Sequence, residues 1–341
     1  MRAVQISQYS QDLEVSFVDI PQPDVTEYQV LVRGEYAGVD PHLVLATTGK
    51  VKIFDHYDFP MTLGNEISGV VVAVGEKITK FNIGDRVYAM PPLGQMGTFS
   101  EYVAIDEKYA AKVPKNLSFE EAASVPLSWL TTLQTFSLLQ PQMGKKIFIS
   151  GGTGGFGQIA VPYAVRLGLE VIVSGASRDK ELAKQMGVQT FIDYEKPNYS
   201  SYTRYFDYVI DTRGVSDLTR QFKMLKKNGH LISLSAGPNK KFTKRQQQNF
   251  SMKQKIIFQL IGFVFDGLAM FQSKTYDFLY VEPSGKQLET YSNYLSQTDN
   301  KPIIDTIYDF EQAEEAIQRM KLGNNQGKIL LKLKKKEETN G

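Results

Sequence analysis

The chain contains no cysteine among its 341 residues, and it has only three histidines and one tryptophan. The absence of cysteine excludes disulfide bonds, thiolate zinc sites, iron–sulfur clusters and a cysteine nucleophile. Cysteine usage therefore indicates nothing about the redox compartment of the protein. Cysteine-based catalysis and cysteine-based metal binding are both ruled out by composition alone.

An excess of charge of either sign is also absent. The sequence contains 39 lysine and arginine residues against 37 acidic ones, which gives a formal net charge of +2. Proteins that bind nucleic acids or anionic membranes usually carry a clear basic excess. The overall charge therefore predicts no nucleic-acid partner, and it identifies no other partner.

Long apolar runs are missing as well. The N-terminal stretch MRAVQISQYSQDLEVSF alternates like a strand and lacks the apolar core of a signal peptide. The most apolar window, IIFQLIGFVFDGLAMF, contains Gln259 and Asp266 and is short for a bilayer span. We therefore expect no integral membrane segment and predict a cytoplasmic protein. The window is expected to be buried against its own domain or a dimer partner, and contact with the pocket or with lipid is the alternative.

The pattern of secondary structure changes along the chain. Up to about residue 115, short strand-like runs such as QVLVRGEYAGV and ISGVVVAVG are separated by glycine, proline, asparagine and aspartate, which is typical of a small all-β unit. From about residue 118, strand-like and helical runs alternate, as in KIFIS, GQIAVPYAVRLG and EVIVS. Alternation of this kind predicts an α/β fold with a doubly wound parallel sheet and helices on both faces.

Five glycines fall within the seven residues from Gly151 to Gly157, directly after the run KIFIS. Gly152, Gly154 and Gly157 fit the G-x-G-x-x-G spacing of a dinucleotide-binding turn between a strand and a helix. In such turns the first glycine permits the tight turn, the second lets the backbone approach the pyrophosphate, and the third lets helix and strand pack closely. The pyrophosphate is predicted to lie against Gly152, Thr153, Gly154, Gly155, Phe156 and Gly157. The alternative is a glycine-rich turn that binds nothing.

The end of the next strand-like run indicates which dinucleotide is bound. An NAD site usually has an acidic residue there to accept from the ribose hydroxyls. Here the sequence has Ser174 and Gly175 at that place. Ser174, Ser177, Arg178 and Lys180 offer hydroxyl and cationic donors to a 2′-phosphate, so NADPH is the predicted cofactor. The alternative is that Arg178 and Lys180 only decorate the start of a helix.

Several blocks of sequence in a fixed order are more specific than the glycines alone. On these blocks the chain resembles the zinc-free medium-chain dehydrogenases/reductases of the NADPH:quinone oxidoreductase (zeta-crystallin-like) group, and the resemblance covers nearly the whole chain. The blocks are YAGVDPHL, LGNEISGVVVAVGEKITKFNIGDRVYA, GTFSEYVAI, EEAASVPLSWLTTLQTF, GGTGGFGQIAVPYAVRLG, FDYVIDTRG and KPIIDTIYDFEQAEEAIQRMKLGNNQGKILL.

The resemblance implies a fold, an assembly and a reaction. It implies a GroES-like β-barrel catalytic domain built from residues 1–120 and 272–341, a Rossmann NADP-binding domain over residues 121–271, and a cofactor cleft between them. It also implies a homodimer formed through the Rossmann sheets. The implied reaction is hydride transfer from NADPH to a quinone, and reduction of the double bond of a 2-alkenal or enone is the alternative.

Zinc-dependent relatives of this group place a histidine and a cysteine where this sequence has Asn65 and Asp40. The cysteine quartet of their structural zinc lobe is also missing, so no metal is expected. A site built from Asp40, Glu66, His42 or His56 is a weak alternative, because its geometry is unspecified. Glu66 is instead expected to order local structure through hydrogen bonds.

Without zinc ligands, alcohol oxidation is disfavoured and the reaction is expected to run toward reduction of an acceptor that is already electrophilic. The protein would then bind NADPH, hold the acceptor near the nicotinamide and exclude water. Asp40 is predicted to line the pocket, and it could act as a general acid only if burial raised its pKa. Tyr57 is a candidate phenolic proton donor, with packing as its alternative role and water as the alternative proton source.

Further cofactor contacts follow from matching blocks of the resemblance. Thr131 corresponds to a threonine close to the nicotinamide, and Tyr194 to a tyrosine near the adenosine phosphate. Ser235 and Gly237 are expected to line the cofactor cleft, and Asn325 and Lys328 to close over the cofactor. Each of these has a structural alternative, as a turn or packing residue.

Two other questions stay open at the level of sequence. Trp129, the single tryptophan, is expected either to narrow the pocket or to fill core. A different class of function is also compatible with the fold, because fold does not determine function. In that alternative the chain is an NADPH-binding sensor or structural protein without turnover.

Overall fold

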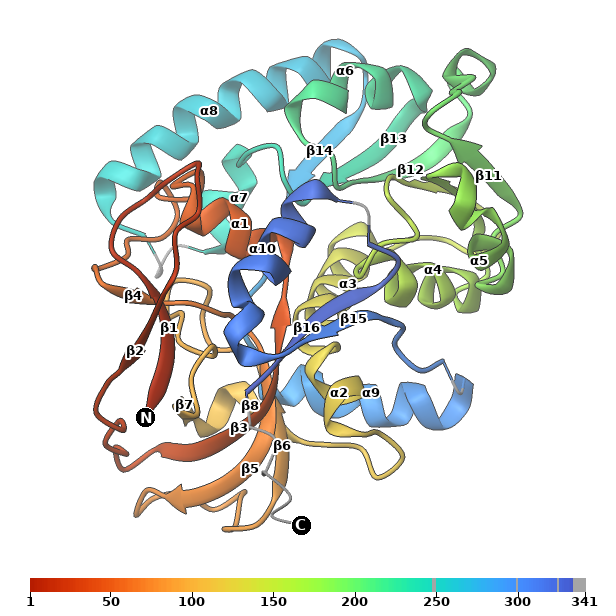
Figure 1. Ribbon diagram of the computed structural model, residues 1–341. Helices are drawn as coiled ribbons and strands as arrows, with labels where there is room; N and C mark the ends of the chain where they lie inside the picture. The colour runs from red at the N-terminus through yellow and green to blue at the C-terminus, as the bar shows by residue number, and fades with distance from the viewer. Residues whose placement is uncertain (247–249, 299, 324, 334–341) are drawn as a thin grey trace. The chain divides into compact units, whose positions relative to one another are not determined.

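The computed structural model describes residues 1–333 apart from 247–249, 299 and 324. The chain forms two compact units (Figure 1). The first unit comprises Met1–Leu130 together with the described residues from Glu282 onward, and the second comprises Thr131–Val281. Each unit has its own sheet and its own hydrophobic core.

The first unit is built on a seven-stranded sheet in which β15, β16, β3, β5, β6 and β8 are successive neighbours and β7 also pairs with β3. A smaller sheet has the order β2, β1, β4. The strands are β1 (Arg2–Ile6), β2 (Ser16–Asp19), β3 (Gln29–Val39), β4 (Met61–Thr62), β5 (Ile67–Val74), β6 (Arg86–Ala89), β7 (Tyr102–Asp106), β8 (Ala110–Lys112), β15 (Ile304–Tyr308) and β16 (Lys328–Lys332). Because β16 pairs with β3 from Ile329 opposite Val39 to Lys332 opposite Tyr36, segments from both parts of the chain complete one sheet.

Short helices complete the first unit. They are α1 (Pro41–Thr47), η1 (Glu107–Tyr109), α2 (Phe119–Ala123), the start of α3 (Pro126–Leu139), α9 (Gly285–Thr298), η4 (Phe310–Gln312) and α10 (Ala313–Leu322). Helix α1 begins after Asp40, whose carboxylate caps the backbone N–H of Leu43, and Pro41 occupies its first turn. Helix α10 ends where Gly323 adopts a left-handed φ of 69°, a conformation that costs glycine little.

Trp129 belongs to the core of the first unit. Its side chain is 1% exposed, and its ring lies 5.0 Å from that of Tyr291 and 4.9 Å from that of Tyr294 on α9. The indole Nε1–H donates to the carbonyl of Gln287 at 3.0 Å. Trp129 therefore fills core between α3 and α9, which is one of the two roles that the sequence left open.

The second unit contains a six-stranded parallel sheet with the order β11, β10, β9, β12, β13, β14 (Figure 1). The strands are β9 (Lys146–Ile149), β10 (Glu170–Gly175), β11 (Thr190–Asp193), β12 (Phe206–Asp211), β13 (Leu225–Ser233) and β14 (Thr275–Phe278). This order runs outward in one direction from β9 to β11 and in the other from β12 to β14. The predicted doubly wound α/β arrangement is confirmed, with its topological switch point between β9 and β12.

Helices connect these strands. They are the rest of α3, α4 (Gly157–Arg166), η2 (Ser177–Asp179), α5 (Lys180–Gln185), η3 (Tyr199–Tyr202), α6 (Val215–Met224), α7 (Lys240–Arg245) and α8 (Met252–Phe271). The core beneath them includes Ile147 and Ile149 of β9, Val171 and Val173 of β10, and Ile210 of β12. These strands read as nearly continuous apolar runs because both faces of a parallel sheet are covered.

Candidate active site

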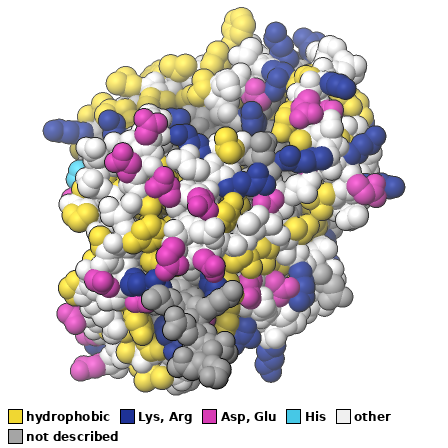
Figure 2. Space-filling view, viewed as in Figure 1, with side chains coloured by type: hydrophobic (Ala, Val, Ile, Leu, Met, Phe, Trp, Pro, Cys, Tyr) yellow, Lys and Arg dark blue, Asp and Glu magenta, His cyan; other side chains and the backbone are white. Residues whose placement is uncertain are grey.

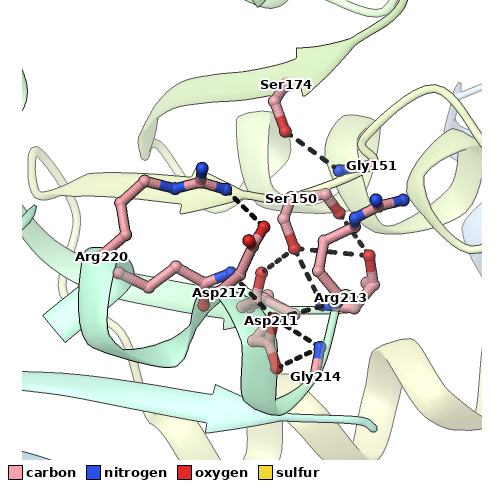
Figure 3. Close-up of polar contacts among 11 residues, drawn as sticks. Ser150, Gly151, Ser174, Asp211, Arg213, Gly214, Asp217 and Arg220 are labelled. Atoms are coloured by element: carbon pink, nitrogen blue, oxygen red, sulfur yellow. Dashed lines mark hydrogen bonds and ion pairs between the residues drawn. The ribbon is translucent and has the colours of Figure 1, made fainter. Parts of the chain in front are cut away.

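The switch point of the parallel sheet lies where β9 ends at Ile149 and β12 ends at Asp211. Hydrogen bonds join the residues that follow these two strands: the Thr212 hydroxyl donates to the Ser150 carbonyl and the Thr212 backbone N–H to the Ser150 hydroxyl, both at 2.8 Å (Figure 3). Ligands of open α/β sheets bind outside the carboxyl ends of the strands at such a point. The glycine-rich turn begins at the next residue, Gly151.

Two of the predicted turn glycines are required by the packing of the protein itself. A Cβ atom on Gly152 would lie 2.5 Å from the Val173 side chain, and one on Gly157 would lie 2.3 Å from the Gly152 carbonyl group. A Cβ atom on Gly154 would meet nothing closer than the Gly151 carbonyl oxygen at 3.6 Å. Packing therefore explains Gly152 and Gly157 but does not require glycine at Gly154, where the predicted approach of the pyrophosphate stays a prediction.

The same turn presents backbone donors at the start of a helix. Helix α4 begins at Gly157 and is 10 residues long. Within the described residues, the backbone N–H groups of Gly155 and Phe156 donate to no protein acceptor. Unpaired N–H groups at a helix N-terminus favour an anion such as a pyrophosphate. The turn thus lies between a strand and a helix and presents backbone donors, and its binding of a pyrophosphate stays a prediction.

Thr153, also predicted to contact the cofactor, is turned into the protein. Its side chain is 3% exposed and its hydroxyl donates to Asp179 at 2.8 Å. Asp179 is buried at the end of η2, and its other oxygen lies 3.5 Å from Nε of Arg178. The pair ties the glycine-rich turn to the segment after β10, and spacing alone did not identify Asp179.

The predicted 2′-phosphate site has acidic side chains nearby that the sequence at the end of β10 does not reveal. Arg178 in η2 and Lys180 at the start of α5 are both exposed, as a phosphate site requires. The Ser177 hydroxyl, however, donates to Asp193 at 2.5 Å and lies 3.3 Å from Glu195. The hydrogen bond from Ser177 holds the pKa of Asp193 below its usual value. Two carboxylates that spacing did not identify therefore share this surface with the two cations.

The acidic group comes from the neighbouring strand. In the parallel pairing of β10 with β11, Asp193 lies beside Gly175, which is the place where an NAD site carries its own carboxylate. Ser174 is 4% exposed, and its hydroxyl accepts from the Gly151 N–H at 3.3 Å. Ser174 consequently supports the turn and presents little of its side chain to a ligand.

The remaining predicted cofactor residues of the second unit lie at the carboxyl edge of the sheet or on α3. Tyr194 follows β11 with 43% of its side chain exposed, and Ser235 is exposed after β13. Gly237 is buried and its carbonyl accepts from the Tyr276 hydroxyl at 2.6 Å. Thr131 is half-buried on α3. Their contacts with a cofactor stay predictions.

A buried acid not singled out from sequence organises the same edge. Asp211 ends β12 fully buried and accepts from the Ser233 hydroxyl at 2.6 Å and from Gln221 at 2.8 Å. It also accepts from the backbone N–H of Gly214 (Figure 3). Burial raises the pKa of Asp211, and the hydrogen bond from Ser233 opposes that shift. These bonds hold the loops after β12 and β13 in place beside the switch point.

In the first unit, the predicted donor Tyr57 belongs to a buried chain of polar contacts. Its hydroxyl lies 3.3 Å from Oδ2 of Asp55 and 3.2 Å from the Leu93 carbonyl. Nε2 of His42 lies 3.5 Å from the same Asp55 oxygen, and Nδ1 of His42 lies 3.2 Å from Oδ1 of Asn65. Burial raises the pKa of Tyr57, so its hydroxyl keeps its proton. This series of polar contacts provides a protonated hydroxyl, that of Tyr57, for proton transfer.

A second buried group surrounds the other predicted catalytic residue. Asp40 is fully buried; Oδ1 accepts from Leu43 at 3.0 Å, and Oδ2 has no hydrogen-bond partner within residues that the structure describes. Glu66 is fully buried as well, accepts from the Leu127 N–H at 2.8 Å and is paired with Lys328. Burial raises the pKa of Glu66 while the Lys328 ammonium lowers it and Asp40 raises it further. Glu66 thus orders local structure, as expected.

The C-terminal residues predicted to close over the cofactor are engaged elsewhere in the first unit. Lys328 is 4% exposed because of its pairing with Glu66. The side-chain amide of Asn325 donates to the Gly327 carbonyl at 2.7 Å and shapes the turn before β16. Across the described parts of the chain, no group of three or more His, Asp or Glu side chains could hold a metal ion. That the chain binds no zinc stays a prediction.

Comparisons with known proteins agree with this architecture. Residues 26–115 match the family model described as alcohol dehydrogenase GroES-like domain, and residues 186–331 match the one described as zinc-binding dehydrogenase. The chain is similar to the 2-methylene-furan-3-one reductase of Solanum lycopersicum, with 28% identity over 92% of this chain and 74% of the relative. The expected GroES-like domain is thereby confirmed.

Two relatives from Arabidopsis thaliana are named for different substrates, one for an alkenal or enone and the other for a quinone. The NADPH-dependent alkenal/one oxidoreductase is 32% identical over 64% of this chain, which spans 58% of that relative. The chloroplast envelope quinone oxidoreductase homolog is 25% identical over 97% of this chain and 98% of its own length. Among solved structures, the quinone oxidoreductase from Coxiella burnetii superposes with a TM-score of 0.83 and 23% identity, over 98% of this chain and 99% of that one. This last likeness shows the fold.

Proposed function

Because the chain belongs to the medium-chain dehydrogenase/reductase family of oxidoreductases, we propose that it transfers hydride from NADPH to a quinone. The observation that carries the proposal is the glycine-rich turn at the sheet's switch point. Its packing leaves room for a Cβ atom at Gly154, and within the described residues the N–H groups of Gly155 and Phe156 have no acceptor. A dinucleotide pyrophosphate fits this combination of space and donors.

NADPH is preferred to NADH in this proposal. The exposed side chains of Arg178 and Lys180 supply positive charge for a 2′-phosphate, and β10 ends without a carboxylate of its own. The relative named as NADPH-dependent supports the same choice. Asp193 and Glu195 oppose it, so we expect a preference for NADPH that is moderate and that responds to both sets of charges.

The bound cofactor supplies the hydride, and the residues of this chain bind it and manage the proton. In the first unit, the Tyr57 hydroxyl is buried, protonated and joined to Asp55. We assign it the role of proton donor to the reduced acceptor, with water as the alternative source. Asp40, whose Oδ2 has no hydrogen-bond partner within the described residues, is assigned to the acceptor-binding surface, where that oxygen would accept from the hydroxyl group that the acceptor gains on reduction.

Reduction of an alkenal or enone is the second candidate. A quinone and an enone share a carbon–carbon double bond conjugated to a carbonyl group, so both accept hydride at an electron-poor centre. The relatives with 28% and 32% identity are named for the reduction of such compounds, which favours this candidate specifically. An NADPH-binding sensor or structural protein without turnover is the third.

The initial rate of NADPH oxidation with a panel of quinones and a panel of 2-alkenals and enones tests these candidates. NADH serves as the cofactor control. Faster turnover with quinones supports the proposal, and faster turnover with alkenals supports the second candidate. NADPH binding without turnover of either panel would leave the sensor or structural role.

Two further properties belong to the proposal. The family resemblance favours a homodimer formed through the parallel sheets, which sedimentation of the full chain tests. A cytoplasmic location is also proposed, and fractionation of cells that express the chain tests it. A dominant organelle fraction would contradict the proposed location.

A further inference from the structure

Helix α8 has an apolar outer face. It covers Met252–Phe271, and by length and composition alone it would suffice to cross a membrane. Eight of its large apolar side chains are between 47% and 91% exposed: Met252, Ile256, Leu260, Phe263, Val264, Leu268, Met270 and Phe271. Figure 2 shows hydrophobic side chains gathered along this helix. An exposed apolar surface of this extent indicates an interaction site.

The opposite face of α8 holds the helix on the second unit. Phe258, Phe265 and Ala269 are buried, and the Phe265 ring stacks on Tyr276 of β14 with centroids 5.2 Å apart. A Cβ atom on Gly262 would lie 2.6 Å from the backbone of Lys240, so α7 and α8 are in close contact. The helix is thus packed along one side and free for a partner on the other. This arrangement suits a helix that lies on a bilayer surface better than one that spans it.

Positive charge is concentrated next to this apolar face. Between residues 240 and 265 the sequence has six cations, Lys240, Lys241, Lys244, Arg245, Lys253 and Lys255, and no acid. Arg245 pairs with Asp277 at 2.7 Å, whereas the five lysines form no ion pair within the residues that the structure describes. Asp266, the one acid on α8, accepts from the Lys240 N–H at 3.1 Å. The balanced net charge of the chain conceals this local excess.

A groove links the two features. It lies between α7 and the first half of α8, has a volume of about 450 Å³, and is lined by apolar side chains including Ile256 and Leu260. Lys244 and Lys255 also line it. So does Thr243, which is 5% exposed and whose hydroxyl has no hydrogen-bond partner in the described part of the chain. Cationic groups beside apolar walls fit the headgroup and upper acyl chain of an anionic lipid.

We propose that the outer face of α8 and the five lysines dock the protein on an anionic lipid bilayer, with the helix lying in the plane of the surface. An anionic bilayer supplies both apolar chains and negative charge. A second copy of the same face would offer the same apolar side chains and the same lysines, and the one acid on its α8, Asp266, already accepts from the Lys240 backbone N–H. The lipid surface is therefore the occupant that matches both properties of the face.

Co-sedimentation of the full chain with vesicles tests the proposal. Binding is expected with phosphatidylcholine vesicles that contain phosphatidylglycerol, and much less with phosphatidylcholine alone or at high salt. Leu260→Gln combined with Val264→Gln should weaken binding on the order of tenfold, because two apolar contacts with the acyl region are lost. Lys241→Gln and Lys253→Gln should each weaken it about fivefold.

Matched control variants distinguish binding through this face from nonspecific binding of exposed apolar or charged side chains to vesicles. Ile83→Gln with Leu322→Gln alters apolar side chains that are 68% and 71% exposed in the first unit, and Lys50→Gln with Lys115→Gln removes two exposed charges there. These controls should bind vesicles as the unaltered chain does. Equal binding by the α8 variants would overturn the proposal. So would a change in sedimentation coefficient without vesicles in the α8 variants alone, since the face would then join two copies.

Discussion

The ammonium of Lys328 is paired with the carboxylate of Glu66, and both side chains are buried in the first unit. The two residues are far apart in sequence, one on β16 and the other directly before β5. The pair joins β16 to the residue directly before β5. Glu66 also accepts from the backbone N–H of Leu127 in the first turn of α3. A buried pair of this kind is costly to break because the remaining charge has no compensation.

Replacement of Lys328 by methionine should lower the free energy of unfolding by about 3 to 5 kcal/mol. Without the ammonium, burial keeps the pKa of Glu66 raised with less opposition, so the variant should gain stability relative to the unaltered chain as the pH falls. Urea unfolding at several pH values measures both effects. Lys328→Met combined with Glu66→Gln should recover part of the loss, and a double variant as unstable as the single one would contradict the pairing.

Two glycines of the turn should respond differently to alanine. Gly157→Ala forces a Cβ atom into the Gly152 carbonyl and is expected to cost about 1 to 3 kcal/mol of stability. Gly154→Ala meets no close protein atom, so its stability should change by less than about 0.5 kcal/mol. Its affinity for NADPH should nevertheless fall about tenfold or more, or about 1.4 kcal/mol, because the backbone can no longer approach the pyrophosphate. Calorimetry and thermal unfolding compare the two, and unchanged NADPH affinity in Gly154→Ala would argue against the turn as a cofactor site.

Cofactor preference should shift in opposite directions at two neighbouring positions. Arg178→Gln removes a cation expected at the 2′-phosphate and should raise KM for NADPH about tenfold. Asp193→Asn removes a carboxylate beside Ser177 and should lower KM for NADPH a few fold, by roughly the worth of one screened charge contact. KM for NADH is the comparison in each case. Lys184→Gln, at an exposed position on the adjoining helix α5, serves as the control and should change neither value.

Tyr88, another buried tyrosine of the first unit, is the control for testing the proposed role of Tyr57. Tyr57→Phe should lower kcat by about 10² through loss of a proton donor, with KM little changed. Tyr88→Phe removes a buried hydroxyl of the same unit that donates to the Leu288 carbonyl at 2.7 Å, and it should affect stability alone. Equal kcat losses in both variants would assign Tyr57 to packing.

A carboxylate of the second unit should govern acid stability. Asp277 is buried; burial raises its pKa, but hydrogen bonds from His230 and Arg245 outweigh that effect and lower the pKa from 3.8 to about 2. Because the folded pKa is depressed, the resulting stabilisation, about 2 kcal/mol, is present above pH 4 and is lost as the pH falls toward 2. Asp277→Asn should therefore be less stable at neutral pH, and its deficit should shrink in acid. Asp58→Asn, with an exposed side chain, is the control for charge and should show no such deficit.

Local features of the fold could be predicted from the chain alone. The switch from short β-rich runs to alternating strands and helices identifies the parallel sheet, because the spacing of apolar residues records which faces are covered. The glycine spacing between β9 and α4 identifies the turn for a similar reason: close packing at Gly152 and Gly157 tolerates no side chain.

Contacts between distant segments could not be predicted in this way. Spacing along β10 indicates a site without carboxylates, yet Asp193 lies beside Gly175 because β10 and β11 are neighbours in the sheet. Sequence leaves Trp129 between two roles, and its packing against Tyr291 and Tyr294 on α9 decides the question.

The sequence by itself determined the family, the parallel sheet and the position of the glycine-rich turn, since each is recorded in short stretches of neighbouring residues. Only the tertiary structure decided that Lys328 is buried against Glu66 and that α8 exposes one apolar face beside a group of lysines. The apolar composition of the α8 segment indicates burial against its own domain or a dimer partner, with contact with the pocket or with lipid as the alternative. Which face remains uncovered depends on where α7 and β14 pack against it, and strand order and packing set that arrangement.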